Sequence, residues 1–304
     1  MAEVAKTMRS VLHRNLVFIH GKGGVGKTAV SKAIAQGLSS SHSKTLWVTL
    51  EDPTHPTGAL RQLGPSLWHL NADFIQAFEE YASMKIGVAT LAKIFLQNKL
   101  IRYLAKAAPG IHELVLLGKI WYERRNYSHV VVDLPSTGHG LALFQSVENF
   151  VKLFTGGPLN KDAAEMLVTF RDPQLTGHLI VTLPEEMPIR ESLELNHYLS
   201  QIIPGNAGVF LVNRLFPEVR TPSGMSELPP PSEWPSPVPD SAEDYSRKRF
   251  ALEHYNLRLL RDEKIRFGEL EYVPPQAQND PESHPSLQLL VSTLSERLHQ
   301  KDYL

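Results

Sequence analysis

A glycine-rich loop that separates an apolar segment from a helical pattern is the feature that most constrains this chain. Residues 15–30 read NLVFIHGKGGVGKTAV, in which an apolar run enters the loop and apolar side chains at helical spacing follow it. Gly21, Gly26, Lys27 and Thr28 match the pattern G-x-x-x-x-G-K-[ST]. A strand, a glycine loop and a helix N-terminus in this order build a loop whose main-chain N–H groups surround phosphate oxygens. The sequence therefore predicts a nucleotide phosphate site.

The residues of this loop have separate expected roles. Lys27 is expected to neutralise the β- and γ-phosphates, and the hydroxyl of Thr28 is expected to ligate Mg²⁺. GTPases commonly read their base with N-K-x-D, and residues 160–163 read NKDA without the final acid, so the predicted nucleotide is ATP. The predicted nucleotide-binding residues of the loop are Gly21, Lys22, Gly23, Gly24, Val25, Gly26, Lys27, Thr28 and Ala29.

Short apolar segments alternate with helical patterns along the 304 residues, of which 42% are apolar. The segments expected to form buried strands are 16–20, 44–53, 129–135, 177–186 and 207–217. Strands that are buried on both faces and separated by helices form a parallel sheet covered by helices. We therefore expect one α/β domain over 1–304, a P-loop NTPase with a mostly parallel sheet and helices on both faces.

A helical subdomain is the second expected component of the fold. Mostly helical patterns at about 60–128 and 145–175 predict the two insertions that form it. Residues 217–241 are rich in Pro and Ser, and we expect an irregular loop there.

The charge balance bears on the class of partner. The formal net charge is −1, which offers no basic surface for nucleic acid or for an anionic membrane. No apolar run is long enough to span a bilayer, and the first 15 residues lack the apolar core of a secretory signal. These features predict a soluble cytoplasmic protein.

The loop GKGGVGKT carries a second lysine, Lys22, and in this it resembles the deviant Walker A motif of one class of P-loop ATPases. In that class the extra lysine crosses a dimer interface and contacts the phosphates of the partner's nucleotide. The resemblance implies a homodimer in which Lys22 and Lys27 act on different ATP molecules. The alternative for Lys22 is a solvated loop lysine.

Two further segments resemble the switch motifs of the arsenite-pump ATPase/Get3 family. EDPTHPTGAL, at 51–60, resembles the first switch, which assigns Asp52 the role of orienting and activating the attacking water. VVVDLPSTGHGL, at 130–141, resembles the second switch, in which Asp133 holds the Mg²⁺ shell through water. Leu-Pro-Ser stands where Thr-Ala-Pro is usual, so the second switch departs from the family pattern. The alternative for Asp52 is a helix N-cap or an Asp-Pro turn.

Three downstream segments agree with the same family in their order along the chain. They are PGIHE at 109–113, TLPEEMPIRESLE at 182–194 and LVNRLFP at 211–217. The last resembles a segment whose asparagine reads adenine, and this assigns Asn213, which has both a donor and an acceptor, to the adenine ring.

Cysteine is absent from the sequence, which separates this chain from several branches of the class. Members that target membrane proteins in eukaryotes hold a dimer with zinc between cysteines, the arsenite-pump branch binds its metalloid through cysteines, and the iron–sulfur members need cluster thiolates. The resemblance therefore implies a cysteine-free ATPase of a bacterial type, with ATP and Mg²⁺ as cofactors, that works as a nucleotide-dependent homodimer.

The resemblance also implies an apolar groove for a hydrophobic client, such as a tail-anchored membrane protein. The apolar positions that would form it are Phe74, Phe78, Tyr81, Val88, Leu91, Phe95, Leu96, Leu100, Leu104, Val147, Phe150, Val151 and Phe154. The alternative is that these side chains only pack against one another and the sheet, as apolar helix faces usually do.

Two other functions remain open from the sequence. A ParA/MinD-type positioning or partition ATPase shares the deviant loop, but that group needs a basic DNA-binding face or a C-terminal amphipathic membrane helix. The near-neutral charge argues against the first, and the expected terminal helix at 285–300 carries few basic residues, which argues against the second. A scaffold that binds ATP without hydrolysing it is the other alternative, and an intact Asp52 argues against it.

Overall fold

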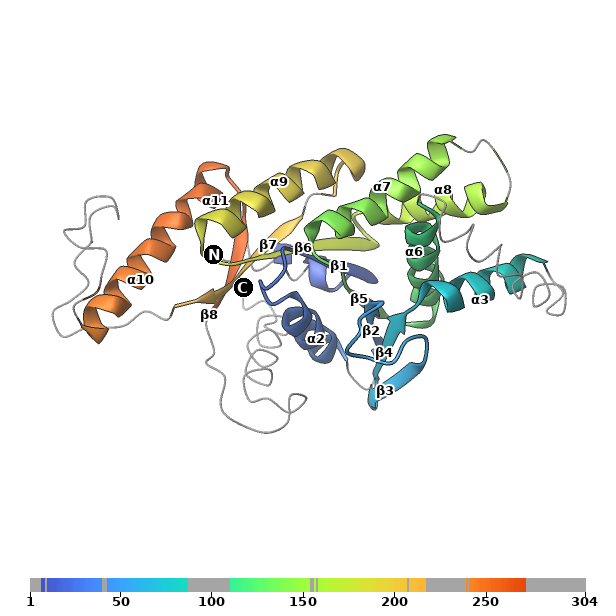
Figure 1. Cartoon of the computed structure of the whole chain (residues 1–304), viewed down its shortest axis with the longest axis horizontal. Helices are drawn as coiled ribbons and strands as arrows, with labels where there is room; N and C mark the ends of the chain where they lie inside the picture. The colour runs from blue at the N-terminus through green and yellow to red at the C-terminus, as the bar shows by residue number, and fades with distance from the viewer. Residues whose placement is uncertain are drawn as a thin grey trace, which may run out of the picture.

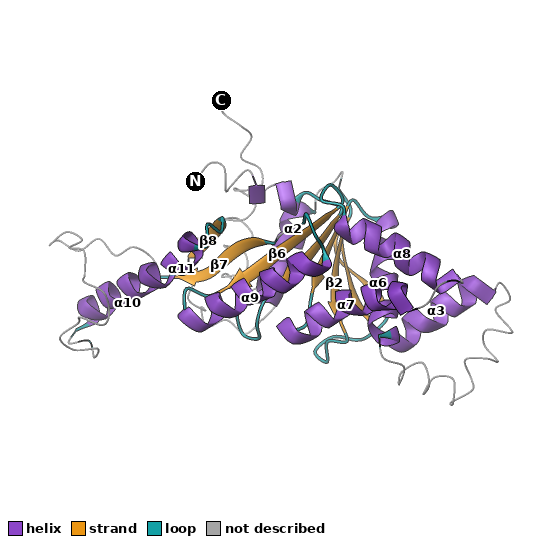
Figure 2. Ribbon diagram, turned by 90° about the horizontal axis from the view of Figure 1, so that it is seen from above, coloured by secondary structure: helices purple, strands orange, loops and turns teal. Residues whose placement is uncertain are grey.

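The computed structural model describes residues 7–8, 10–39, 43–86, 110–153, 156, 158–206, 208–216, 239 and 241–271. These residues form a twisted sheet with helices on both faces, as Figure 1 shows from the side and Figure 2 from above. The predicted α/β class is confirmed. The strands are β1 (Leu16–His20), β2 (Thr45–Leu50), β3 (Leu60–Gly64), β4 (Leu67–Ala72), β5 (His129–Asp133), β6 (Thr176–Thr182), β7 (Val209–Leu215) and β8 (Phe267–Glu271).

The order of the strands places the three sequence motifs at one edge of the sheet. The order is β3-β4-β2-β5-β1-β6-β7-β8, and all neighbouring pairs are parallel except the antiparallel pair of β3 with β4. The glycine loop follows β1, Asp52 follows β2, and Asp133 ends β5. Because β2, β5 and β1 are adjacent and parallel, these three features meet at the carboxyl ends of the strands, where open parallel sheets bind their ligands.

Helices cover both faces of this sheet (Figure 2). α2 packs on one face, where its apolar side chains join those of the central strands. α3, α6, α7 and α8 contribute to the core on the opposite face, and α9 and α11 enclose a smaller cluster over β6 and β7. The helices are α2 (Lys27–Leu38), α3 (Phe74–Ile86), α6 (Ile111–Glu123), α7 (Thr137–Leu153), α8 (Pro158–Arg171), α9 (Glu186–Ile202), α10 (Ala242–Asn256) and α11 (Arg258–Asp262).

The strand β1 illustrates why the sequence runs without polar interruption at the centre of the sheet. Leu16 and Phe18 join the core on the side of α6 to α8, whereas Val17 and Ile19 join the core on the side of α2. All four side chains are fully buried. A strand that is covered on both faces has no solvated side, so successive residues are all apolar.

The expectation of helix from about residue 60 is wrong for residues 60–72. These residues form the antiparallel strands β3 and β4, joined through Gly64-Pro65-Ser66. Leucines recur there at intervals of three and four residues and imitate a helix, but a proline in the middle removes a main-chain donor and breaks such a helix. The strand pairing buries Leu67 and leaves Leu60 exposed, which a single helical face would not do.

Of the six described positions named for a client groove, five pack in the core, and the sixth, Tyr81, donates a hydrogen bond to Asp162 at 2.9 Å and lines a cavity. Phe74, Val147 and Phe150 are buried in the main cluster, and Phe78 and Val151 pack against it. For these positions the packing alternative holds. Val88, Leu91, Phe95, Leu96, Leu100, Leu104 and Phe154 lie outside the described residues, as do most of 217–241 and all of 285–300.

Candidate active site

The glycine loop turns from β1 into α2 through main-chain angles that favour glycine. Gly21 has φ of 146° and Gly26 has φ of 94°. A Cβ atom on Gly26 would lie 2.5 Å from Nδ2 of Asn213, and one on Gly21 would collide with the carbonyl oxygen of Val181. The glycines of the motif are therefore needed to pack the loop as well as to make room for phosphate.

The N-terminus of α2 has the features of an anion site. Gly26 is its N-cap, and within the described chain no side chain caps the helix and no acid lies in its first turn. Its first N–H groups thus point out of the helix without an internal acceptor. Lys27 Nζ donates to the carbonyl of Lys22 at 3.0 Å, which holds the ammonium against the loop. Burial lowers the pKa of Lys27, and the carboxylate of Asp133 partly opposes that shift.

Thr28 and Asp133 meet beside this helix end although they are 105 residues apart. The Thr28 hydroxyl donates to Oδ2 of Asp133 at 2.6 Å. The other carboxylate oxygen, Oδ1, is buried and has no hydrogen-bond partner among the described residues. Burial raises the pKa of Asp133 to about 6, and the Thr28 hydroxyl and the Lys27 ammonium oppose the shift. A hydroxyl next to an unsatisfied carboxylate oxygen fits Mg²⁺, which prefers oxygen ligands and keeps several waters.

This raised pKa predicts that Asp133→Asn stabilises the nucleotide-free protein at neutral pH. The folded state holds the proton more tightly than the unfolded state, so the favourable contribution of protonated Asp133 is lost as the pH rises from about 4 to about 6. The shift corresponds to about 3 kcal/mol. In urea unfolding without Mg²⁺ or nucleotide, the advantage of the variant in free energy of unfolding should grow by that amount between about pH 4 and pH 7. A difference in free energy of unfolding between Asp133→Asn and wild type that does not change with pH would contradict the raised pKa of Asp133.

Asp52 lies on the loop that follows β2. Its Oδ1 accepts hydrogen bonds from the amide of Thr54 at 2.8 Å and from the Thr54 hydroxyl at 2.7 Å, and its Oδ2 lies 4.0 Å from Nε2 of His55. Burial raises the pKa of Asp52, but the two hydrogen bonds from Thr54 and the nearby His55 outweigh it, and the pKa is lowered. The contact with Thr54 forms a turn of the kind that was the alternative to a catalytic role for Asp52. The Asp52 side chain is nevertheless 23% exposed and faces solvent. An ionised, accessible carboxylate is what a role toward an attacking water requires.

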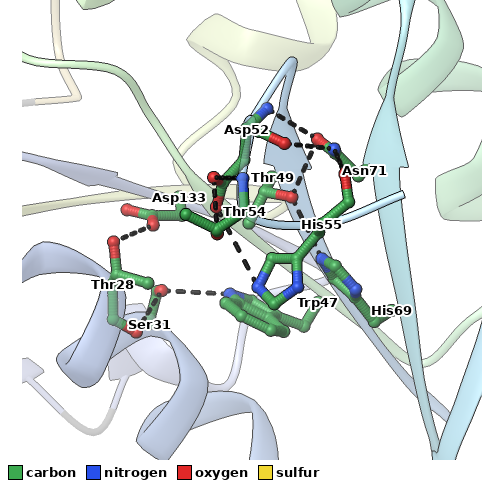
Figure 3. Close-up of polar contacts among 10 residues, drawn as sticks. All are labelled: Thr28, Ser31, Trp47, Thr49, Asp52, Thr54, His55, His69, Asn71 and Asp133. Carbon is green, nitrogen blue, oxygen red and sulfur yellow. Dashed lines mark hydrogen bonds and ion pairs between the residues drawn. The ribbon is translucent and has the colours of Figure 1, made fainter. Parts of the chain in front are cut away.

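A polar network behind Asp52 was not predicted from the sequence (Figure 3). It links Trp47 and Thr49 on β2 with His69 and Asn71 on β4. Burial, followed by the charge of His55, lowers the pKa of His69 to about 4, so its ring is neutral at physiological pH. The signal that could have found these residues is the strand LWHLNA at 67–72, where polar side chains alternate with apolar ones.

Lys22 contacts α9, a pairing that none of the sequence motifs predicts. Its Nζ forms an ion pair with Oε1 of Glu191 on α9, and its side chain is 48% exposed. The pairing is within one chain, so the predicted contact with a partner's nucleotide stays a prediction.

Asn213, near the end of β7, lies against the glycine loop. Its Nδ2 donates to the carbonyl of Val25 at 2.9 Å, and its Oδ1 accepts from the amide of Arg214 at 3.0 Å. The amide that was assigned to adenine thus supports the loop in this structure, and its contact with adenine stays a prediction.

Comparison with known proteins agrees with this site. Residues 14–167, which hold the glycine loop, Asp52 and Asp133, match the family model described as the anion-transporting ATPases.

In the described part of the chain, no helix combines the length and the apolar character needed to cross a bilayer.

Several curated proteins are similar to this chain over most of its length. ATPase BagA of Mycobacterium tuberculosis is 28% identical over 236 residues, which cover 70% of this chain and 68% of that protein. A protein of Aquifex aeolicus that bears the name of an arsenical pump-driving ATPase is 26% identical over 245 residues, covering 66% of this chain and 80% of its own length. An ATPase ASNA1 homologue of Plasmodium vivax is 26% identical over 229 residues, which cover 62% of this chain and 60% of that protein. The family model extends over half of the sequence and the relatives are named as ATPases, so this chain belongs to the ArsA family of anion-transporting ATPases.

Proposed function

We propose that this ATPase is a switch in which two copies of the chain close around two ATP molecules and separate after hydrolysis. The observation that carries the proposal is the contrast between the two lysines of the loop. Lys27 bonds within its own loop, whereas the half-exposed Lys22 pairs with Glu191 at the surface. A partner's phosphates could replace Glu191 as the anion that Lys22 meets, because a phosphate carries more charge than the carboxylate.

The residues at the carboxyl ends of the strands have separate roles in hydrolysis. The first N–H groups of α2 and the ammonium of Lys27 hold the phosphates and stabilise the charge that develops on them. Thr28 and, through water, Asp133 would hold Mg²⁺, which would supply further neutralisation of the phosphate charge. Asp52, ionised by its hydrogen bonds, orients the attacking water and accepts its proton.

The dimer is tested by the mass of the protein in solution. With Mg²⁺ and a non-hydrolysable ATP analogue, light scattering should report a doubling of the 34.1 kDa mass. With ADP the protein should return to the monomer mass, since the γ-phosphate is what Lys22 of the partner contacts. A mass that is the same with the analogue, with ADP and without nucleotide would contradict the switch.

The output of the switch in this proposal is the shielding of a hydrophobic client in the cytoplasm. A cavity of about 220 Å³ lies between α3, α6 and α8. Met84 and Tyr122 line it and are 49% and 42% exposed, so part of its apolar lining is accessible. Charged side chains line it as well: Glu80, Lys119, Arg125, Asp162 and Glu165. The absence of cysteines from this sequence favours an apolar client over a metalloid, which would need thiolate ligands.

Capture of an apolar helix tests this output. With ATP bound, the dimer should keep a tail-anchor peptide soluble, and Met84→Asp should weaken that capture because a charge would be buried against the peptide. Leu252→Asp on α10, also at an exposed apolar position, is the matched control and should capture the peptide as wild type does. Equal capture by both variants, or capture that does not depend on nucleotide while ATP hydrolysis is normal, would contradict client binding at this cavity.

A further inference from the structure

Asn71 on β4 makes a hydrogen-bonding arrangement that fixes the first-switch loop. Its side chain is fully buried. Nδ2 donates to the carbonyl of Asp52 at 2.8 Å and to the carbonyl of His55 at 2.9 Å. Oδ1 accepts from the amide of Asp52 at 2.9 Å and from the Thr49 hydroxyl at 3.1 Å. Both donor hydrogens and both acceptor sites of the amide are therefore used, and the group has one orientation that satisfies its neighbours.

The strand pairing explains why Asn71 can reach this loop. β2 and β4 are parallel, and Thr49 lies directly opposite Asn71. β2 ends one residue later, and the chain leaves the sheet through Glu51, which has φ of 47°. The side-chain amide of Asn71 thus forms the hydrogen bonds that a neighbouring strand would otherwise form with the main chain of Asp52, which lies beyond the end of β2. The carbonyl of Asn71 also accepts from the amide of Gly58 at 2.8 Å, so both ends of the loop are tied to this residue.

The loop that Asn71 holds is the one that carries the carboxylate of Asp52. The Asn71 side chain accepts from the amide of Asp52 and donates to its carbonyl, and the Thr54 hydroxyl and amide donate to one oxygen of the Asp52 side chain. Figure 3 shows these contacts around Asp52, which hold its main chain and one carboxylate oxygen in place. A small displacement of a group that orients the reacting water lowers the rate much more than it lowers substrate binding.

The same network continues from Asn71 to the phosphate helix. The Thr49 hydroxyl donates to Asn71, so it accepts at its 3.0 Å contact with Nε2 of His69. The His69 ring stacks on Trp47 with centroids 4.4 Å apart, and Nε1 of Trp47 donates to the Ser31 hydroxyl of α2 at 3.0 Å. Buried networks of this kind polarise one another and hold their members in a single arrangement.

We propose that Asn71 is a positioning residue for ATP hydrolysis, which acts by holding the main chain of residues 52–55 so that Asp52 meets the attacking water. This inference rests on the role of Asp52 in the proposed function. Asn71 makes no direct hydrogen bond to the phosphate loop among those described above. Its most direct link to the reaction is the main chain of Asp52, whereas its link to α2 passes through three further side chains.

The test compares turnover with nucleotide binding. Asn71→Ala should lower kcat about a hundredfold, the size of effect known for misplaced catalytic groups. The dissociation constant for a non-hydrolysable ATP analogue with Mg²⁺ should stay within about threefold of wild type, because the phosphate loop is intact. Leu70→Ala, which removes a buried side chain on the opposite face of β4, controls for general loosening and should keep kcat when assayed well below its Tm.

Asn71→Asp adds a signature that loss of packing does not produce. This variant keeps the shape but places a carboxylate oxygen against the carbonyls of Asp52 and His55. Its kcat relative to wild type should rise as the pH is lowered from about 8 to about 6, because the protonated acid regains one donor and burial favours the protonated form. In addition, the double variant Asn71→Ala with Asp52→Asn should be no slower than Asp52→Asn alone.

Three results would overturn the inference: a kcat of Asn71→Ala within about threefold of wild type, a loss of ATP binding in proportion to kcat, or additive losses in the double variant. They differ from failure of the proposed function. If Asp52→Asn itself hydrolyses ATP at the wild-type rate, the role of Asp52 fails; if that variant is inactive and Asn71→Ala is fully active, only the role of Asn71 fails.

Discussion

Asp52→Asn is expected to abolish ATP turnover and to leave ATP binding close to that of wild type. The substitution keeps the shape of the side chain and an oxygen that can accept from Thr54. It removes the negative charge and the ability to take a proton from the attacking water, a contribution of about 10²- to 10⁴-fold in rate. Phosphate release under saturating ATP and Mg²⁺ measures the first effect, and binding of a non-hydrolysable analogue measures the second.

The same chemical change at a distant site provides the control for this experiment. Asp262, at the end of α11, is exposed, and Asp262→Asn should hydrolyse ATP as wild type does. A wild-type rate in Asp52→Asn would show that its carboxylate has no part in the reaction. A fall in ATP affinity equal to the fall in rate would show that Asp52 supports binding and not the chemical step.

Lys22→Ala is expected to remove hydrolysis by a different route. The substitution leaves Lys27 and the N-terminus of α2 in place, so one chain should still bind ATP. It removes the charge that each subunit is proposed to offer to the partner's phosphates, so the closed dimer should form weakly. Removing a cation that stabilises charge in the transition state of phosphoryl transfer costs on the order of 10³-fold or more in rate.

The measurement for Lys22→Ala combines ATP hydrolysis with light scattering in the presence of the analogue. Lys161→Ala, which removes an exposed lysine from α8, is the control and should retain both activity and dimer formation. Full activity of Lys22→Ala, with the mass of a dimer, would leave Lys22 as a solvated loop lysine.

The features that can be predicted from the sequence are those that a short run of consecutive residues specifies. The glycine loop lies between a strand and a helix within sixteen residues, and Asp133 ends a strand of β-branched residues. Once both are assigned to parallel strands, their meeting at one edge of the sheet follows from the geometry of such sheets. The pairing of Thr28 with Asp133 is thus a consequence of fold class.

Other parts depended on which strands become neighbours, and single motifs do not contain that information. Asn71 reaches the loop of Asp52 only because β4 pairs with β2 in a register that sets Asn71 opposite Thr49. The leucines of its segment recur at helical intervals, so the sequence pattern favours a helix there and does not reveal the network. Glu191 lies within the family-like segment 182–194, but that resemblance does not indicate its contact with Lys22, which depends on how α9 packs beside the loop.

We propose that one catalytic site is built from two chains, and a mixture of two inactive variants tests this arrangement. Lys22→Ala and Asp52→Asn are each expected to be inactive alone. In a mixed dimer, the Lys22→Ala subunit keeps Asp52 and receives Lys22 from its partner, so that one site is complete. If subunits combine at random in a two-fold dimer, an equimolar mixture should recover about one quarter of the wild-type activity. If the mixture is as inactive as its components although mixed dimers, detected with differently labelled subunits, do form, Lys22 does not act across the interface and the proposed shared site is contradicted.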